Sequence, residues 1–361
     1  SETIPLDEKG EWIVYNNSNS ELPSNSINCL VIDEDNTKWI GTDNGLAKFD
    51  GNTWEIFDTL NSDIPSNYIS CIAIDQFNNK WIGTFGKLAK FDGSKWEVYD
   101  TTNSEIPSID YFGEIAIDHD DNKWLADVRA KDFSKLGLVK YDNNSWTVYD
   151  TVNSGLPTNN VFCVEVDEDN NKWIGTAVYL WGPAAGKGLV KFDDTTWTMY
   201  NEVNSELPNN SIADLAFDSE NNLWLLTQDG LTKFDGISWN TEERLVDNCG
   251  DVYCLAIDSQ NKKWIGLNGQ TNGYGTNGCG ISIFNKIEWE KIYASSDGLP
   301  SNMVRCITID KYGNKWIGTT PQIDGEFAKL SDGGFAVYNE EGIITNVETI
   351  EKKESLTPPK F

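Results

Sequence analysis

The chain has 361 residues, and its 28 Lys and Arg stand against 57 Asp and Glu, which gives a net charge of −29. Such an acidic surface repels phosphate backbones and anionic lipid headgroups, which argues against nucleic-acid and membrane-surface binding. No apolar run approaches the roughly 20 residues that cross a bilayer, and a single histidine, His119, excludes most histidine-dependent chemistry. We therefore expect no nucleic-acid partner, no membrane span, no metal and no cofactor.

The first apolar segment, EWIVY at 11–15, is typical of a single short strand. Further along, residues 69–99 contain four short apolar runs, ISCIAID, KWIGT, KLAKF and WEVY, with Asn, Asp or Gly in the breaks. The runs are rich in β-branched and aromatic residues, and the breaks are rich in turn-forming residues. This pattern predicts a four-stranded antiparallel meander.

The meander recurs along the chain. Its second run carries a tryptophan in each of seven copies: Trp39, Trp81, Trp124, Trp173, Trp224, Trp264 and Trp316. A second aromatic marks the fourth run: Trp54, Trp96, Trp146, Trp197, Trp239 and Trp289, with Phe335 assigned to the last copy. Four-stranded repeats of roughly 40 to 50 residues are the signature of a β-propeller. We predict an all-β fold, a seven-bladed β-propeller of four-stranded antiparallel blades.

We expect one propeller domain over residues 1–340, with inner strands starting near 27, 69, 112, 161, 212, 252 and 304, and a C-terminal tail at 341–361. Eight blades are the alternative, since ITNVETI at 344–350 resembles another inner strand, although no KWIGT or GLAKF run follows it. How the ring closes stays open between Glu11–Tyr15 and Phe335–Tyr338.

Two recurring residue types have structural interpretations. Five cysteines share the third position of the first strand: Cys29, Cys71, Cys163, Cys254 and Cys306. A cysteine that recurs in this way packs as a small apolar group, so we predict a chain without disulfides. Each first strand ends in Asp before a turn, which predicts an Asx-type hairpin, because the full calcium loop with its Gly and distal Glu is absent.

Departures from the repeat indicate where a site lies. Nearly all length variation falls between second and third strands, at 128–136, 177–188, 268–280 and 321–325. These connections share one face of a propeller, and stable scaffolds place binding residues on such loops. They carry Arg129, Tyr179, Trp181 and Tyr274, which we interpret as a platform for a sugar ring. The alternative is that these aromatic side chains only pack the loops onto the blades.

A second group of candidates interrupts the inner strands. Glu114 and Asp214 replace the recurring cysteine, and Glu165 replaces a small residue in the blade between them. A buried charge costs several kcal/mol unless it is paired or solvated. We predict a ligand site near the axis that includes Arg305, a possible partner for these carboxylates across the ring; a water-filled channel is the alternative.

The combination LPSNxIxCIAID, NNKWIGT, GLAKFDG and WEVYDT closely resembles the two-component regulator propeller repeat, over residues 11–340. The resemblance implies a periplasmic or surface propeller that binds a ligand, often an oligosaccharide, or another protein. After the last blade the sequence shows a charged tail ending ESLTPPKF and no kinase or membrane helix, so we do not expect a complete sensor. We expect export, with a leader that is not in this sequence.

Our functional prediction is a non-catalytic, ligand-binding and oligosaccharide-sensing propeller of the bacterial cell envelope, acting as a monomer. The alternatives are a protein–protein interaction scaffold and, because paired carboxylates can act as acid and base, a carboxylate-dependent hydrolase or lyase. The sequence leaves the ligand, the partner and the pathway open.

Overall fold

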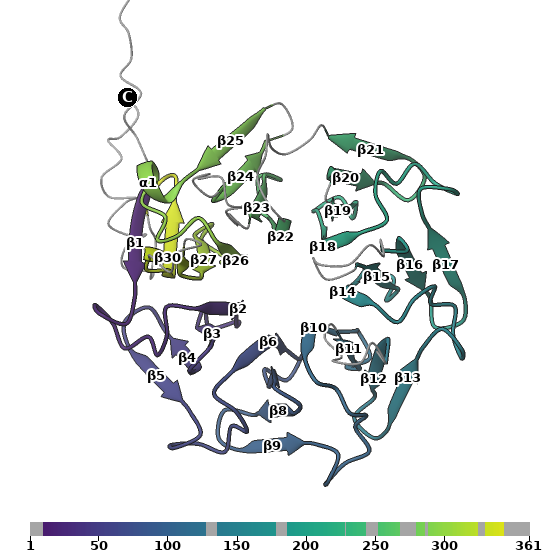
Figure 1. Cartoon of the computed structure of the whole chain (residues 1–361), viewed down its shortest axis with the longest axis horizontal. Helices are drawn as coiled ribbons and strands as arrows, with labels where there is room; N and C mark the ends of the chain where they lie inside the picture. The colour runs from purple at the N-terminus through teal and green to yellow at the C-terminus, as the bar shows by residue number, and fades with distance from the viewer. Residues whose placement is uncertain are drawn as a thin grey trace, which may run out of the picture.

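The computed structural model describes residues 10–127, 136–177, 186–227, 229–242, 252–267, 279–285, 288–323 and 329–342. Seven four-stranded antiparallel sheets stand around a central axis (Figure 1). The prediction of an all-β, seven-bladed propeller is therefore confirmed. Helix is confined, in the described residues, to the single turn α1 (Ala294–Asp297) between the sixth and seventh blades.

Each of the first six blades consists of four consecutive strands, ordered from the axis outward. The strands of the first three blades are β2 (Ile27–Ile32), β3 (Lys38–Thr42), β4 (Gly45–Phe49) and β5 (Trp54–Phe57), then β6 (Ile69–Ile74), β7 (Lys80–Thr84), β8 (Leu88–Phe91) and β9 (Trp96–Tyr99), then β10 (Phe112–Ile117), β11 (Lys123–Asp127), β12 (Leu138–Tyr141) and β13 (Trp146–Tyr149). Those of the next three are β14 (Val161–Val166), β15 (Lys172–Thr176), β16 (Leu189–Phe192) and β17 (Trp197–Tyr200), then β18 (Ile212–Phe217), β19 (Leu223–Thr227), β20 (Gly230–Phe234) and β21 (Trp239–Glu242), then β22 (Val252–Ile257), β23 (Lys263–Leu267), β24 (Ile281–Phe284) and β25 (Trp289–Ile292).

The seventh blade joins the two ends of the chain. It consists of β26 (Val304–Ile309), β27 (Lys315–Thr319), β30 (Gly334–Asn339) and, outermost, β1 (Glu11–Tyr15). The N-terminal strand therefore closes the ring, side by side with β30 in Figure 1.

This arrangement corrects the assignment of Phe335 to a fourth strand. Phe335 lies on β30, the third strand, where it pairs with Gly318 on one side and Tyr15 on the other. The fourth position of the last blade is occupied by β1, which covers the edge of β30. Trp12 packs against Tyr338 across this junction, with ring centroids 4.6 Å apart. The segment 344–350, the candidate for an eighth blade, lies outside the described residues.

The cysteines on the inner strands pack as the sequence predicts. Cys71, Cys163 and Cys254 are buried, and each faces a glycine of the neighbouring second strand. A Cβ atom on Gly175 would overlap the Sγ atom of Cys163, and the other blades with this pair repeat the relation. Burial raises the pKa of these thiols, so they stay neutral.

The prediction of a chain without disulfides is wrong, because Cys279 is disulfide-bonded. Cys279 does not occupy the recurring inner-strand position, and its partner lies outside the described residues. The apolar packing role of the inner-strand cysteines therefore does not extend to Cys279.

The Asx-turn interpretation of the repeated aspartates is confirmed. In each blade the Asp after the inner strand accepts a backbone N–H four residues later and the indole N–H of the second-strand tryptophan; Asp118 accepts these bonds from Asn122 N and Trp124 Nε1, both at 2.8 Å. The same pair of bonds is present at Asp33, Asp75, Asp167, Asp218, Asp258 and Asp310. Each aspartate thus ties its turn to the blade core.

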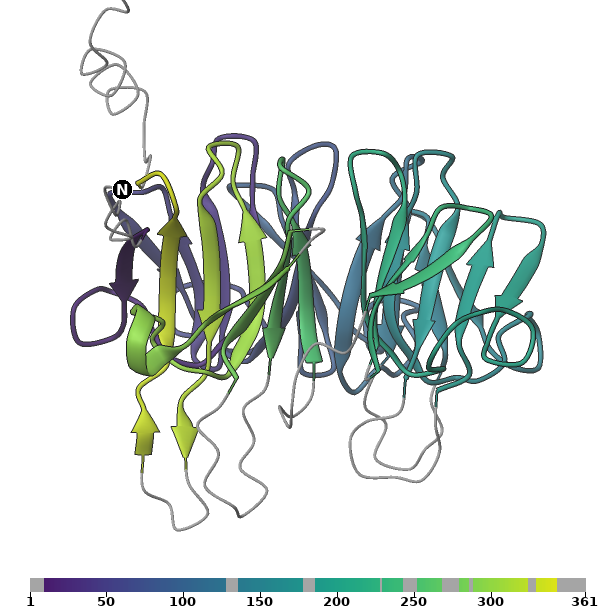
Figure 2. The same cartoon turned by 90° about the horizontal axis from the view of Figure 1, so that it is seen from above.

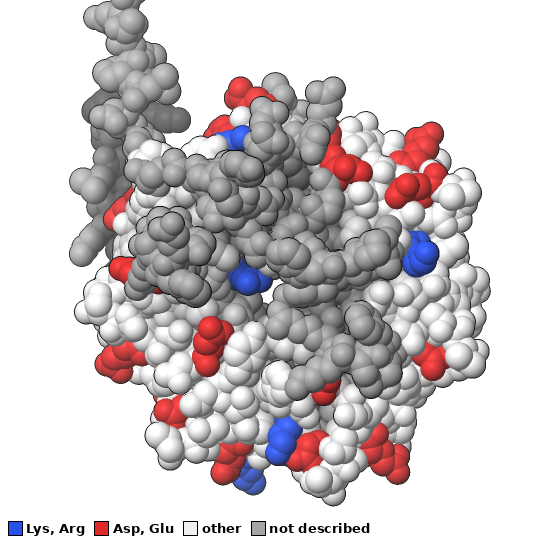
Figure 3. Space-filling view, viewed as in Figure 1, with Lys and Arg blue, Asp and Glu red and all other residues white. Residues whose placement is uncertain are grey.

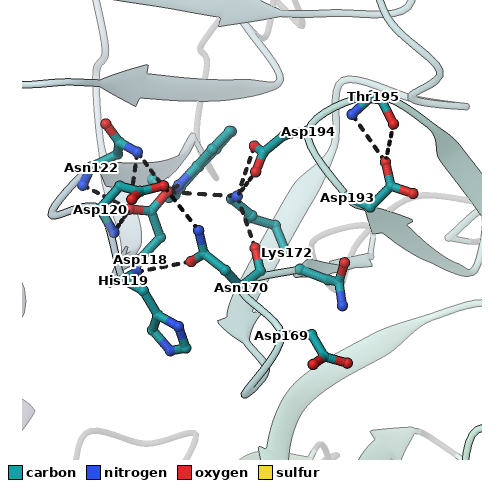
Figure 4. A network of polar contacts seen from close by, with 12 residues as sticks. Asp118, His119, Asp120, Asn122, Asp169, Asn170, Lys172, Asp193, Asp194 and Thr195 are labelled. Carbon is teal, nitrogen blue, oxygen red and sulfur yellow. Dashed lines mark hydrogen bonds and ion pairs between the residues drawn. The ribbon is translucent and has the colours of Figure 1, made fainter.

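A buried lysine joins most neighbouring blades, which the sequence analysis did not anticipate. Lys172, the first residue of β15, is fully buried and lies 3.6 Å from Asp118 of the preceding blade and 2.7 Å from Asp194 (Figure 4). Its ammonium nitrogen also lies 5.1 Å from the ring centroid of Trp124. Equivalent lysines sit over the tryptophan of the preceding blade at Lys38, Lys80, Lys123, Lys263 and Lys315. Only the fifth blade has an apolar residue, Leu223, at this position.

Candidate functional site

The inner strands surround a central cavity of about 390 Å³. Its walls come from the second to fifth residues of these six-residue strands. Each inner strand begins on the face that carries the long connections. Four of the residues singled out from the sequence line it together: Glu114, Glu165, Asp214 and Arg305.

A β-bulge explains which side chains line the wall. In every inner strand the pairing register shifts between the first and third residues, which leaves the second residue unpaired with the neighbouring strand. Bulges of this kind re-aim a side chain. The cavity is lined by all seven of these residues: Asn28, Ser70, Gly113, Phe162, Ala213, Tyr253 and Arg305. Phe162 and Tyr253 were not predicted from the sequence, although the variability of this position within a regular repeat was a usable signal.

Two of the carboxylates belong to a changed residue pair. Glu114 lies opposite Ala126, and Asp214 lies opposite Leu226, where the regular blades have Cys opposite Gly. The larger partner occupies the space that a cysteine sulfur would need, so the acidic side chain extends to the next blade instead. Glu114 Oε2 accepts a bond from Val164 N at 2.9 Å.

Asp214 makes the corresponding contact two blades further on. Its Oδ2 atom accepts a bond from Leu255 N at 2.6 Å, and its Oδ1 atom accepts one from Leu215 N at 2.8 Å. Both Glu114 and Asp214 thus satisfy backbone donors at the inner edge of the sheets, which no strand covers. An unsatisfied donor there would otherwise require water.

Glu165 differs from the other two carboxylates. It stands where the other blades have Val31, Ala73, Ala116, Ala216, Ala256 or Thr308. Its carboxylate is reached only by the backbone of its neighbour Val166, and no ion pair involves it within the described part of the chain. Burial, and secondly the charge of Asp214, raise the pKa of Glu165 to about 7.

The three carboxylates influence one another. Burial raises the pKa of Glu114 well above its ordinary value, and the charges of Asp214 and Glu165 raise it further. Burial also raises the pKa of Asp214, against the lowering effect of the bonds from Leu255 and Leu215. The cavity therefore holds carboxylates that take up protons near neutral pH.

Arg305 lies on the seventh blade, across the axis from these acids. Its guanidinium carbon is 4.4 Å from the ring centroid of Tyr253. No ion pair joins Arg305 to Glu114, Glu165 or Asp214 among the described residues, so the suggested pairing across the ring is not formed. The cavity thus has an acidic wall and an opposite wall with a cation on an aromatic ring.

The four candidate residues on loops, Arg129, Tyr179, Trp181 and Tyr274, lie outside the described residues. On the same face, the hairpin of β28 (Gln322–Ile323) and β29 (Lys329–Ser331) projects from the seventh blade beyond the ends of the other strands (Figure 2). In the face view of Figure 3, the described acidic residues are spread over the outer part of the ring.

An aromatic group that the sequence analysis overlooked lies beside the cavity on this face. Tyr68 and Tyr111 directly precede the inner strands β6 and β10, and their hydroxyl oxygens are 3.3 Å apart. Phe85, which pairs with Tyr111 through an isolated bridge, is 58% exposed. Phe85 lies in the short connection between β7 and β8, where the sequence has no insertion.

The described residues form no metal-binding cluster, and the single histidine does not line the cavity. Nowhere in the described ranges do three or more His, Cys, Asp or Glu side chains gather closely enough to hold a metal ion. His119 is in a turn after β10, where its backbone N–H bonds to Asn170 (Figure 4). Among the described helices, none has the length and apolar character to cross a membrane.

The family model described as the two component regulator propeller matches residues 21–44, 206–229 and 298–320. No curated protein is significantly similar to the chain in sequence. Among solved structures, the extracellular domain of BT3049 from B. thetaiotaomicron, described as a hybrid two component system, is 20% identical with a TM-score of 0.69. The match covers 91% of this chain and 41% of that one, so the chain spans about two fifths of its length.

Two further structures share the fold. PorZ, a surface component of the type-IX secretion system of Porphyromonas gingivalis, is 15% identical with a TM-score of 0.65, over 87% of this chain and 46% of PorZ. Virginiamycin B lyase from Staphylococcus aureus is 12% identical with a TM-score of 0.64, over 91% of this chain and 99% of the lyase. At these identities the similarity establishes the propeller fold alone.

Proposed function

Because the chain carries repeats of the two-component regulator propeller family, we propose that it is a non-catalytic, ligand-binding propeller of the bacterial cell envelope. The observation that carries the proposal is the central cavity, where charged residues replace the residues of the repeat. Stable repeat packing does not require Glu165 or Arg305, since the other blades have uncharged residues at these positions. Among the described residues these two side chains make no ion pair, and charged side chains that line a cavity in this way are typical of binding sites.

Within this proposal the ligand is an oligosaccharide, bound at the mouth of the cavity on the face with the long connections. Carboxylate oxygens accept bonds from sugar hydroxyls, and exposed aromatic rings cover the apolar faces of sugars. The cavity provides Glu114 and Glu165, and Tyr68, Tyr111 and Phe85 provide aromatic surface beside it.

Export is supported by the disulfide of Cys279, because disulfides persist in oxidising compartments outside the cytoplasm. The structural neighbours from sensors and from the type-IX secretion system are extracellular or surface proteins, which agrees with this location. Periplasm and cell surface are equally compatible with these observations.

The test is a thermal-shift screen of an oligosaccharide library against the wild-type chain and Arg305→Ala. We expect a glycan that raises the Tm of the wild type and has no effect on the variant; Lys48→Ala, an exposed lysine on β4, serves as the control that keeps binding. If no glycan raises the Tm while a pull-down from envelope extract yields a protein that Arg305→Ala releases, the interaction scaffold replaces the glycan sensor.

The enzyme alternative has one observation in its favour, because a carboxylate with a pKa of about 7, such as Glu165, suits general acid catalysis. Mass spectrometry of a bound glycan after prolonged incubation separates the two functions. We expect the glycan to be recovered intact, whereas cleavage that Glu165→Gln abolishes would establish a hydrolase or lyase.

A further inference from the structure

We infer that the central cavity selects ligands that carry primary ammonium groups, which the carboxylates of the acidic wall bind. This inference rests on the proposed function, since it assumes that the cavity is a ligand site, and it adds the chemical class of the ligand. Amino sugars with a free amine and aliphatic diamines belong to this class.

The cavity carries more acidic than basic side chains. Three carboxylates, on Glu114, Glu165 and Asp214, face the cavity together with one guanidinium, on Arg305. The other titratable groups on its wall include the thiols of Cys29, Cys71, Cys163, Cys254 and Cys306, whose pKa values are all raised by burial. At pH 8, above the pKa of about 7 of Glu165 and Asp214, these two carboxylates are ionised and outnumber the single guanidinium even with Glu114 protonated. A bound cation would offset this excess of negative charge.

The carboxylates of the acidic wall have oxygen atoms available to accept hydrogen bonds. Glu114 accepts the Val164 N–H through Oε2, and its Oε1 atom has no hydrogen-bond donor among the described residues. Among the described residues, the Glu165 carboxylate is reached only by the backbone of Val166. An ammonium group has three N–H donors and no acceptor, so it matches the carboxylate oxygens of the acidic wall and not the Arg305 guanidinium, which offers donors alone.

The spacing of the acids argues for an organic cation. Among the described residues, no three metal-binding side chains, the cavity carboxylates included, form a group that could hold a metal ion. A cavity of about 390 Å³ lies within the ordinary size range of small-molecule sites. Phe162 and Tyr253 provide apolar wall for the carbon skeleton between the amines.

The ligand class can be tested by calorimetric titration with 1,4-diaminobutane, with 1,4-butanediol as the neutral analogue of equal length. We expect the diamine to bind the wild type at pH 8 and about 0.15 M salt, where exposed charges are largely screened, and the diol not to bind. Glu165→Gln should weaken diamine binding at least tenfold, whereas Glu105→Gln, which removes an exposed carboxylate outside the cavity, should leave it unchanged.

The pH dependence provides a second readout. Diamine binding should weaken from pH 8 to pH 5 as the carboxylates become protonated, and this change should shrink in Glu165→Gln. If Glu165→Gln and Glu105→Gln weaken diamine binding equally, the diamine is attracted by the overall negative charge of the protein and the inference is overturned. If a neutral oligosaccharide binds through Arg305 while the diamine does not, the ligand class is wrong and the proposed function stands; if neither binds, both are wrong.

Discussion

Charged side chains occur between the blades and in the central cavity, and the two regions differ in the partners that these side chains have. Between the blades, Lys172 is fully buried but contacts Asp118, Asp194 and the ring of Trp124. In the central cavity, Glu165 makes no ion pair among the described residues. Buried lysines with partners recur around the ring, whereas an acidic residue at the inner-strand position of Glu165 occurs in one blade.

We interpret the charge of Lys172 as structural and propose that the charge of Glu165 is available to a ligand. The contacts of a buried lysine with its partners offset the free energy that its desolvation costs. Removal of one partner leaves the other charge buried without compensation, which is strongly destabilising. A carboxylate without a partner lowers stability when ionised and is kept only if something outside the fold uses it. Lys172 and Glu165 should therefore respond in opposite directions when their charges are removed.

The largest effect is expected from Lys172→Met, which keeps the apolar stem and removes the ammonium group. Asp118 would lose its cation while it remains buried, so the free energy of unfolding should fall by about 3 kcal/mol in urea denaturation. Lys48→Met is the matched control, because its ion pair with Glu55 is exposed to solvent and should contribute about 1 kcal/mol or less. Equal losses for both variants would contradict a structural role for the buried lysines.

A smaller effect is expected from Gly175→Ala. The added methyl group would overlap Cys163 Sγ and approach Ile212 of the next blade, so stability should fall by about 1–3 kcal/mol. Cys163→Ala in the same chain should recover part of this loss, because it frees the space beside Gly175. A double variant no more stable than Gly175→Ala would show that the Cys–Gly pair does not explain why acids coincide with Ala126 and Leu226.

Asp214 should distinguish a hydrogen-bonding role from a role of charge. Asp214→Ala leaves the N–H groups of Leu255 and Leu215 without their acceptor and should cost about 1–2 kcal/mol. Asp214→Asn keeps an acceptor oxygen and should stay closer to the wild type in the same denaturation experiment. If Asn and Ala are equally destabilising, the negative charge itself holds the neighbouring blade.

The fold could be predicted from the sequence because each blade repeats the same local signals. The Asp, the turn and the Trp recur in every copy, and their bonds are local, within six residues. Ring closure could not be predicted, since β1 and β30 are far apart in sequence and their pairing depends on which edge lacks a strand. The same reason explains the wrong assignment of Phe335.

The candidate site was only partly predictable. Glu114, Glu165 and Asp214 were visible as departures from a repeat, and the cavity brings them together with Arg305. Phe162 and Tyr253 were not singled out, because their contribution to the wall depends on the bulge, which displaces one residue in each inner strand. The buried role of Lys172 was missed because its partner Asp118 belongs to the preceding blade.

We propose that the Glu165 carboxylate is unfavourable for the fold and serves a ligand. Since its folded-state pKa of about 7 exceeds the ordinary 4.5, its protonated form stabilises the fold below pH 4.5, and this contribution is lost as pH rises through 7. The most direct measurement is the urea stability of the wild type and Glu165→Gln at pH 5 and pH 8. We predict that the variant is the more stable protein at pH 8, with a smaller difference at pH 5; a variant less stable than the wild type at pH 8 would contradict the account.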